Sequence, residues 1–184
     1  MEPIKIIELQ WHGPFKFNEL LSENDNEEQF SKPGVYLWVE RKHNRLCYVG
    51  RSLSNILKRQ KDHNTKLVGG LYTIPKEYRR SETRDWIPNQ NENADILFDQ
   101  DKFVDLITDA FSYRDDIDIY LCPVTESKEM LKALERNLLF DLQPYGTKPG
   151  RFSPPNPKIE IVHKNAGWKE TVDKAYRCNI TLSE

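Results

Sequence analysis

The sequence predicts an α+β fold, in which short strands share one core with amphipathic helices. Residues 35–39, 46–49 and 117–121 are short runs rich in β-branched and aromatic side chains, a composition typical of strands. Residues 99–111 and 127–142 instead repeat apolar side chains at helical spacing. The two patterns together indicate a mixed class.

At the N-terminal end the pattern is weaker. Loose alternation over residues 4–11 predicts a short strand, and residues 17–21 predict a helical turn. The acidic, Asn-rich stretch 22–28 is expected to be a loop.

A clearer hairpin follows. The turn sequence Ser31-Lys32-Pro33-Gly34 introduces the strand at 35–39, and a polar turn, residues 40–45, leads to the strand at 46–49. Strands joined by so few residues should pair as an antiparallel hairpin.

Helices and one further strand follow the hairpin. Ser54 is expected to cap a helix running to about residue 64, and Ser127 to cap the helix that ends before Pro144. Residues 117–121 form the third strand. Beyond residue 148 we expect a strand at 159–163 and a helix near 168–177.

Composition excludes several classes of protein. The 184 residues fit one domain with modest extensions, and 4 Trp, 8 Tyr and 8 Phe can build a core although charged residues make up 30%. No apolar run approaches the ~20 residues of a membrane helix, and residues 1–5 do not resemble a signal peptide. The dispersed Cys47, Cys122 and Cys178 argue against a disulfide scaffold or a zinc site. We therefore expect a soluble cytoplasmic protein.

Charge is unevenly distributed along the chain. The net charge is only −2 and the pI about 6.1, so the whole-domain basicity typical of nucleic-acid-binding proteins is absent. Residues 41–62, however, carry seven bases against one acid, and residues 92–118 nine acids against two bases. This asymmetry allows one basic face on an acidic body, or simply a solvated surface.

One carboxylate interrupts an apolar stripe. At ~100° per residue, Glu135 falls among the leucines of the last clear helix. These are Leu131, Leu134, Leu138, Leu139 and Leu142. A carboxylate carried into a core needs a cation, a metal or a raised pKa, unless its stem lies on the core and its head reaches water.

Arg59 and His63 lie four residues apart, on one face of the predicted helix. A guanidinium suits phosphate oxygens, and histidine transfers protons near neutral pH. An ordinary polar helix face is the alternative. For Tyr36 and Tyr48 on the hairpin, the alternative to a functional role is that both rings only pack against their neighbours.

Taken together, these residues resemble the GIY-YIG nuclease family. Gly34-Val35-Tyr36 is followed by Tyr48-Val49-Gly50, then by Arg59 and His63 on a helix and by Glu135 on a later helix. The resemblance extends over about residues 32–144. It implies a small three-stranded antiparallel sheet flanked by helices, and an enzyme that hydrolyses phosphodiester bonds.

The resemblance also implies boundaries. Residues 1–31 would form an N-terminal extension, and residues 32–147 the nuclease-like domain with an insertion at about 68–111. Residues 148–184 would form a C-terminal extension packed on that domain.

The resemblance assigns a role to each site residue. Tyr36 and Tyr48 would line the site, Arg59 would hold the scissile phosphate, and His63 would assist proton transfer or orient a tyrosine. Glu135 would bind one divalent metal, Mg²⁺ or Mn²⁺. A lone carboxylate suits Mg²⁺, which keeps most of its waters. Tyr36 could act as a base only if nearby cations lowered its pKa from ~10; otherwise hydroxide or a metal-activated water would serve.

Two departures from the family pattern stand out. Thr147 occupies the position at which many members carry Asn, which puts catalytic competence in question. One extra residue separates Tyr48 from Arg59, so Lys58 is the fallback for the arginine role.

The insertion interleaves aromatic and basic residues. Its rings and cations could contact bases and phosphates, or the segment could be a loop braced by its own aromatics. The aromatic residues are Tyr72, Tyr78 and Trp86. Together with three basic residues that precede the insertion, its arginines make up the nucleic-acid-binding candidates: Arg51, Lys58, Lys61, Arg79, Arg80 and Arg84.

The sequence thus predicts a magnesium-dependent endonuclease acting on DNA, with RNA as a second substrate class. One rival is an idle module of the same fold that only binds nucleic acid, and another is a protein-interaction domain. A protein partner or a homodimer fits any of these. Steep loss of nucleic-acid affinity with salt would separate the first two from the third.

Overall fold

The computed structural model describes residues 5–22, 25–72, 74–75, 78, 100–145 and 153–171. The chain divides into two compact units, which we call the sheet unit (1–59 and 118–184) and the helical unit (60–117). Strands and helices are mixed, so the predicted α+β class is confirmed.

The principal sheet has four strands and not the predicted three. Its order is β2 (His12–Phe15), β5 (Ile117–Pro123), β3 (Gly34–Glu40) and β4 (Arg45–Ser52). The β2–β5 and β3–β4 pairs are antiparallel, so the predicted hairpin is confirmed. The additional strand is β2, whose sequence, His-Gly-Pro-Phe, lacks apolar alternation. Pro14 is tolerated there because β2 lies at the edge of the sheet.

Pairing within the hairpin determines which side chains share a face. Tyr36 lies opposite Gly50, and Trp38 lies opposite Tyr48. Residues directly opposite each other project to the same side, and successive residues alternate. The aromatic side chains therefore share one face, while Leu37 and Val49 project from the other face into the apolar core.

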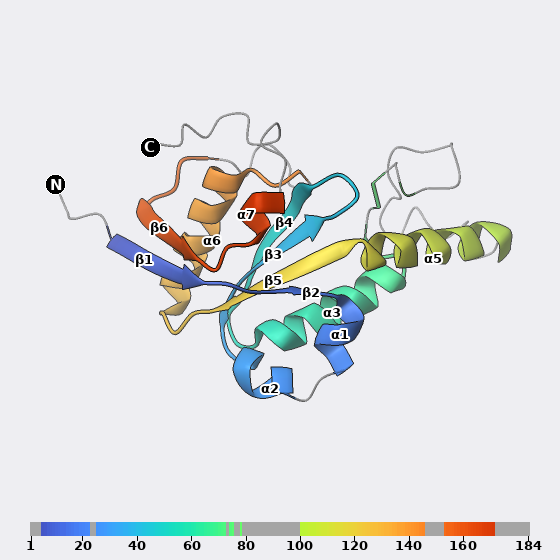
Figure 1. The fold of residues 1–184 in the computed structure, drawn as a ribbon, viewed down its shortest axis with the longest axis horizontal. Coiled ribbons are helices and arrows are strands. Elements are labelled where there is room, and N and C mark those ends of the chain that lie inside the picture. The colour runs from blue at the N-terminus through green and yellow to red at the C-terminus, as the bar shows by residue number, and fades with distance from the viewer. Residues whose placement is uncertain are drawn as a thin grey trace. The chain divides into compact units, whose positions relative to one another are not determined.

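A separate pair of strands joins the two ends of the described chain. β1 (Lys5–Gln10) runs parallel to β6 (Ile159–Lys164), as Figure 1 shows, with Lys5 opposite Ile159 and Gln10 opposite Lys164. Both strands were predicted, at residues 4–11 and 159–163, the first of them from alternation. Ile7 and Leu9 are the buried positions of β1 and belong to the same core as the hairpin.

α6 (Lys128–Leu142) covers the apolar face of β3 and β4. Ser127 caps it by accepting a hydrogen bond from the Met130 backbone N–H, as predicted. Leu131, Leu134 and Leu138 are fully buried.

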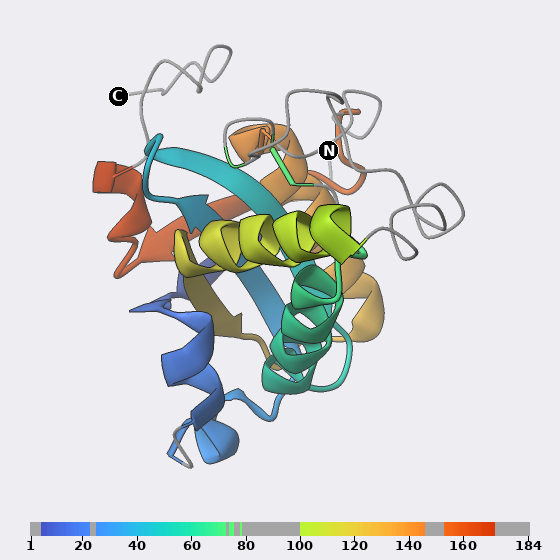
Figure 2. The same ribbon diagram turned by 90° about the vertical axis from the view of Figure 1, so that its right-hand side faces the viewer.

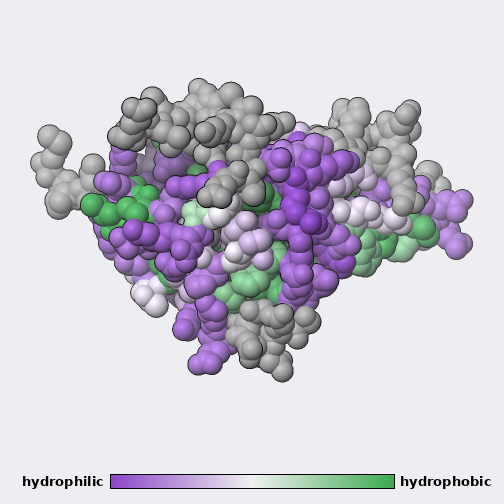
Figure 3. All heavy atoms as spheres, viewed as in Figure 1, coloured by the Kyte–Doolittle hydropathy of each residue, from purple (hydrophilic) through white to green (hydrophobic). Residues whose placement is uncertain are grey.

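Seen from the direction of Figure 1, the space-filling view is dominated by hydrophilic side chains with smaller apolar patches between them (Figure 3).

Asn137 ties α6 to the C-terminal segment. Its amide nitrogen donates to the Pro157 carbonyl at 3.1 Å, and its carbonyl oxygen accepts from the Ile159 N–H at 2.9 Å. The short α7 (Trp168–Thr171) adds Trp168 to the core. The remainder of the helix predicted near 168–177 lies outside the described residues.

Two short helices precede the hairpin. α1 (Phe17–Ser22) confirms the predicted helical turn, but α2 (Asp25–Phe30) replaces part of the predicted loop. The reason lies at the end of α2, where Phe30 is fully buried and packs edge-on against His12 and Phe15 of β2. The burial of Phe30 therefore fixes the end of α2, although the segment is acidic.

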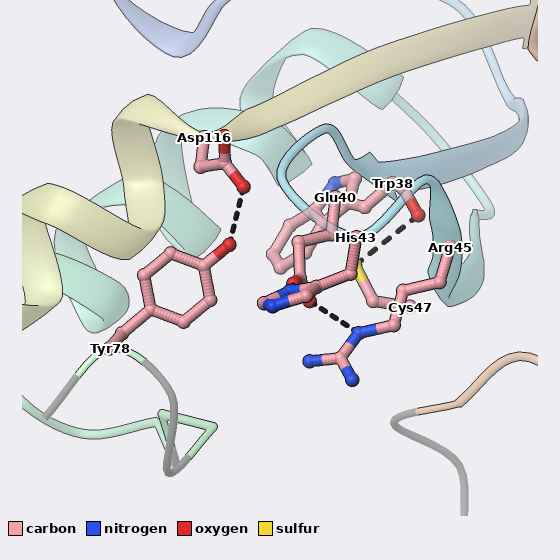
Figure 4. A network of polar contacts seen from close by, with 7 residues as sticks. All are labelled: Trp38, Glu40, His43, Arg45, Cys47, Tyr78 and Asp116. Atoms are coloured by element: carbon pink, nitrogen blue, oxygen red, sulfur yellow. Dashed lines mark hydrogen bonds and ion pairs between the residues drawn. The ribbon is translucent and has the colours of Figure 1, made fainter. Parts of the chain in front are cut away.

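In the helical unit, α5 (Gln100–Asp115) crosses near the end of α3 (Ile56–Val68), as Figure 2 shows. Gly70 has φ +70° and lies against Leu106. The Tyr78 hydroxyl donates to the Asp116 carboxylate (Figure 4), and the Tyr78 ring contacts Tyr113 at 5.0 Å between ring centroids. Among the described helices, none is long and apolar enough to span a membrane.

Candidate active site

The two motif tyrosines pack together on the hairpin. Their ring centroids are 6.0 Å apart with an interplanar angle of 24°. Trp38 extends the cluster, at 5.0 Å from the Tyr48 ring. Tyr36 is only 1% exposed, whereas Tyr48 is partly exposed, so Tyr48 is the more accessible ring of the pair.

The glycines beside these tyrosines have a steric explanation. A Cβ on Gly50 would lie 2.5 Å from Cζ and Oη of Tyr36 and 2.7 Å from Cε1 of Tyr48. A Cβ on Gly34 would lie 2.2 Å from the Cys122 carbonyl oxygen. Because real Cβ contacts are longer, only glycine fits either position. The first glycine allows the tyrosines to pack, and the second allows β5 to approach.

Arg59 reaches the tyrosine pair from α3. The start of this helix is fixed by Asn55, whose side-chain oxygen accepts a hydrogen bond from the Lys58 N–H at 2.7 Å, so the predicted Ser54 cap is wrong by one residue. The Arg59 guanidinium donates a hydrogen bond to the Tyr36 hydroxyl, which is also hydrogen-bonded to the Tyr48 hydroxyl. Arg59 therefore contacts the tyrosine pair, whereas Lys58 is exposed.

The surroundings of Tyr36 keep its hydroxyl protonated. Burial and the neighbouring Tyr48 raise the pKa of Tyr36, and the Arg59 hydrogen bond only partly opposes them. The condition under which Tyr36 could accept a proton, a pKa lowered by cations, is not met. Tyr36 is suited to donating and orienting hydrogen bonds instead.

Glu135 finds a cation. Its carboxylate Oε2 forms an ion pair with an Nη of Arg51, the residue that follows Gly50 on β4. The Glu135 side chain is 18% exposed and the Arg51 side chain 29% exposed. Of the options that the leucine stripe left open, a cationic partner is therefore the one observed.

The two halves of the candidate site meet the same strand. Alternation places Tyr48 and Gly50 on one side of β4 and Arg51 on the other. β4 is the outermost strand of the sheet, so both sides adjoin one edge. The fold thus assembles Tyr36, Tyr48 and Arg59 into one cluster and places the Arg51–Glu135 pair on the opposite side of the same edge strand.

His63 lies in the helical unit, one turn beyond Arg59 along α3. It is only 2% exposed, and its Nδ1 shares a hydrogen bond of 2.6 Å with the Tyr72 hydroxyl. Tyr72 was predicted only as an aromatic residue of the insertion. Its bond to His63 is a contact that sequence spacing did not indicate.

The remaining basic candidates are divided. Lys61, like Lys58, is exposed on α3. Arg79, Arg80, Arg84 and Thr147 lie outside the described residues, as does Trp86.

Whether the site suits a divalent metal depends on one carboxylate. Among the described residues no group of three His, Cys, Asp or Glu side chains could enclose an ion. Mg²⁺ is commonly held by one or two carboxylates together with substrate phosphates and waters. Glu135 fits that kind of site, in which the substrate supplies ligands, but not a site built from protein ligands alone.

A fully buried carboxylate on the hairpin was not anticipated. Glu40 is fully buried, and Arg45 Nε lies 2.7 Å from its Oε2, while His43 contacts the other oxygen (Figure 4). The Arg45 guanidinium also lies 3.9 Å from the centre of the Tyr145 ring. This cluster fastens the segment after α6 to the hairpin turn. Its sequence signal was the presence of opposite charges, Glu40 and Arg45, at the two ends of the turn predicted at residues 40–45.

Comparisons of this chain with models of protein families, with curated proteins and with solved structures find no match.

Proposed function

We propose that this protein is a metal-dependent endonuclease of the GIY-YIG type that hydrolyses phosphodiester bonds, DNA being the expected substrate. One observation carries the proposal. Three residues that the sequence motifs indicated, on three different elements, are joined by hydrogen bonds: Tyr36, Tyr48 and Arg59. They lie beside Gly50, a position where any larger residue would clash with both tyrosine rings.

In this mechanism Arg59 binds a nonbridging oxygen of the scissile phosphate. Hydrolysis places additional negative charge on the phosphate oxygens, and a fixed guanidinium stabilises that charge more in the transition state than in the substrate. The Tyr36 hydroxyl accepts a hydrogen bond from Arg59 and thereby holds the guanidinium in position. Tyr48, the more exposed tyrosine, orients the attacking water.

Glu135 would hold one Mg²⁺ or Mn²⁺, which supplies charge neutralisation at the phosphate and help for the departing oxygen. His63, fixed by Tyr72, would serve as an orienting or proton-transferring group. Because the raised pKa keeps Tyr36 protonated, the proton of the water is left to solvent hydroxide.

One observation favours a second candidate. The Arg51–Glu135 ion pair neutralises the only carboxylate assigned to the metal. A module of the same fold that binds nucleic acid through Arg51 and Arg59 without cutting it would have the same contacts. RNA, a protein partner and a homodimer also belong among the proposals.

Cleavage of labelled duplex, flapped and single-stranded DNA in Mg²⁺ tests the proposal. We expect Arg59→Ala to reduce cleavage by about 100-fold or more, the range for removing one preorganised donor. Lys61→Ala, an exposed lysine two residues further along α3, should lose less than about 3-fold, because it makes at most a phosphate contact.

Binding decides between the candidates. If wild type binds DNA with steep salt dependence but cuts none of these substrates, the binding module is correct. If it neither binds nor cuts any nucleic acid, both proposals fail.

A further inference from the structure

The Arg51–Glu135 pair is placed where its partners can exchange. Arg51 lies on the outermost strand of the sheet, and Glu135 on the helix that covers the neighbouring face. Neither side chain is sealed in the core, since 29% and 18% of their surfaces remain exposed. Solute ions can therefore reach both groups.

A carboxylate held by a guanidinium is a weaker ligand for a cation. The positive charge of Arg51 opposes a metal ion at Glu135, and the pair occupies Oε2. A partly exposed ion pair is worth at most about 1 kcal/mol, so the pair is easily broken by a better partner for either member.

Phosphate is an alternative partner for Arg51, because a guanidinium can bind carboxylate and phosphate oxygens in the same bidentate way. Guanidinium groups bind phosphate oxygens through two parallel hydrogen bonds, in a strong and directional arrangement. Arg51 directly follows Gly50, which lies against the tyrosine cluster that Arg59 joins. A phosphate bound at the edge of β4 would therefore lie close to Arg51.

We propose that Arg51 exchanges between Glu135 and the substrate phosphate, so that Glu135 binds a divalent cation more tightly when nucleic acid is bound. This inference rests on the proposed function and adds its regulation. Substrate and metal then bind cooperatively, because each favours the arrangement in which Arg51 has left the carboxylate. No bond is made or broken in the exchange.

Metal affinity without nucleic acid tests the exchange. The probe is Mn²⁺ alone, with free ion measured by electron paramagnetic resonance. We expect Arg51→Gln to bind Mn²⁺ about 5-fold more tightly than wild type, the factor that corresponds to losing a competing pair of about 1 kcal/mol. The gain should vanish in Arg51→Gln combined with Glu135→Gln.

Two matched variants isolate the pair from net charge and from folding. Arg41→Gln removes an arginine that pairs with Asp118 at 3.7 Å, and it should leave Mn²⁺ affinity close to the wild-type value. Arg51→Lys preserves the charge and should also stay near wild type. If Arg51→Gln does not fold, the oligonucleotide-dependent gain in Mn²⁺ binding of wild type over Glu135→Gln still tests the exchange, and its absence would overturn the exchange.

A second measurement adds a short oligonucleotide. In wild type it should increase Mn²⁺ binding beyond the increase seen with Glu135→Gln, whereas Arg51→Gln should show no such excess. Equal Mn²⁺ affinity in Arg51→Gln and Arg41→Gln would overturn the exchange, as would a gain that survives Glu135→Gln. A confirmed gain in a protein that cuts nothing would leave the exchange standing and refute the nuclease.

Discussion

Gly50 determines the geometry of the tyrosine pair at the residue scale. Its α-carbon lies so near both rings that no side chain fits between them. Tyr36 cannot move away to relieve a clash, because it is 1% exposed and hydrogen-bonded to Arg59. The close approach is thus a packing requirement and a condition for the position of Arg59.

We expect Gly50→Ala to lower the free energy of unfolding by about 1–3 kcal/mol, the usual cost of forcing an extra methyl into a packed site. Gly167→Ala is the matched control, because nothing lies within 4 Å of its added Cβ, and it should change stability by less than about 0.5 kcal/mol. Urea unfolding of the two variants measures both values. Equal effects would mean that the predicted clash is absent.

Tyr36 should affect the rate of cleavage without affecting its pH dependence. Burial raises the pKa of Tyr36 above its ordinary value of about 10, so its hydroxyl stays protonated near neutral pH. We expect Tyr36→Phe to lower kcat by about 10- to 100-fold, through the lost hydrogen bond to a charged group. The limbs of the pH–rate profile should stay in place. A limb that disappears in the variant would show that Tyr36 titrates during turnover.

At the element scale, α3 carries Arg59 and therefore determines where the guanidinium lies. Its first turn is held by Asn55, while Ser54 is exposed. Ser52 supports the same turn by accepting hydrogen bonds from the backbone N–H groups of Ser54 and Asn55.

Asn55→Ala should therefore destabilise the protein by about 1 kcal/mol, the typical value of a helix cap, and Ser54→Ala by less than about 0.5 kcal/mol. Thermal or urea unfolding of the two single variants separates them. The reverse order would return the cap to Ser54, where the sequence pattern placed it.

Elements with a strong period were predictable, and those fixed by distant contacts were not. β3, β4 and α6 follow from β-branched runs and a leucine stripe. β2 has no period of its own and is a strand because β5 pairs with it. α2 depends on Phe30 finding a pocket of aromatic rings. The polar composition of these two segments predicts loops, and neither segment has a local pattern that predicts a strand or a helix.

At the scale of the whole molecule, the two ends of the described chain are joined around Trp11. Its indole N–H donates to Nδ1 of His163 on β6 at 3.0 Å, and Trp168 packs against both rings. Nδ1 must therefore be unprotonated. Burial, together with the charge of Lys169, lowers the pKa of His163 to about 4.

Stability should consequently fall in mild acid. Between pH 6.5 and about 4 the unfolded state binds a proton that the folded state does not, so the free energy of unfolding rises with pH in this window. The contribution is complete above pH 6.5 and is lost as the pH falls through about 4. We expect a loss on the order of 2 kcal/mol.

His163→Gln is the control for this pH dependence. Its side-chain oxygen can still accept the Trp11 hydrogen bond but does not titrate, so the slope between pH 4 and 6.5 should flatten. Urea unfolding at several pH values, followed by tryptophan fluorescence, gives both curves. Parallel curves would assign the acid sensitivity to other groups.

The candidate site was predictable in its members more than in its contacts. The resemblance to the GIY-YIG family implied a shared site for Tyr36, Tyr48 and Arg59, and the position of Glu135 in an apolar stripe left a cation, a metal, a raised pKa or exposure to water as its outcomes. Nothing in the sequence identified that partner as Arg51, because the contact spans 84 residues and depends on α6 lying over β4. The raised pKa of Tyr36 likewise follows from burial, which spacing does not reveal.

We propose that Glu135 and the Arg59–tyrosine cluster form one metal-dependent hydrolytic site. The most direct test is nicking of supercoiled plasmid by wild type and Glu135→Ala, each with Mg²⁺ and with chelator. We expect that nicking requires Mg²⁺ and is lost in Glu135→Ala, while an Arg136→Ala variant at the exposed neighbouring position cuts like wild type. Metal-dependent nicking that survives in Glu135→Ala would contradict it.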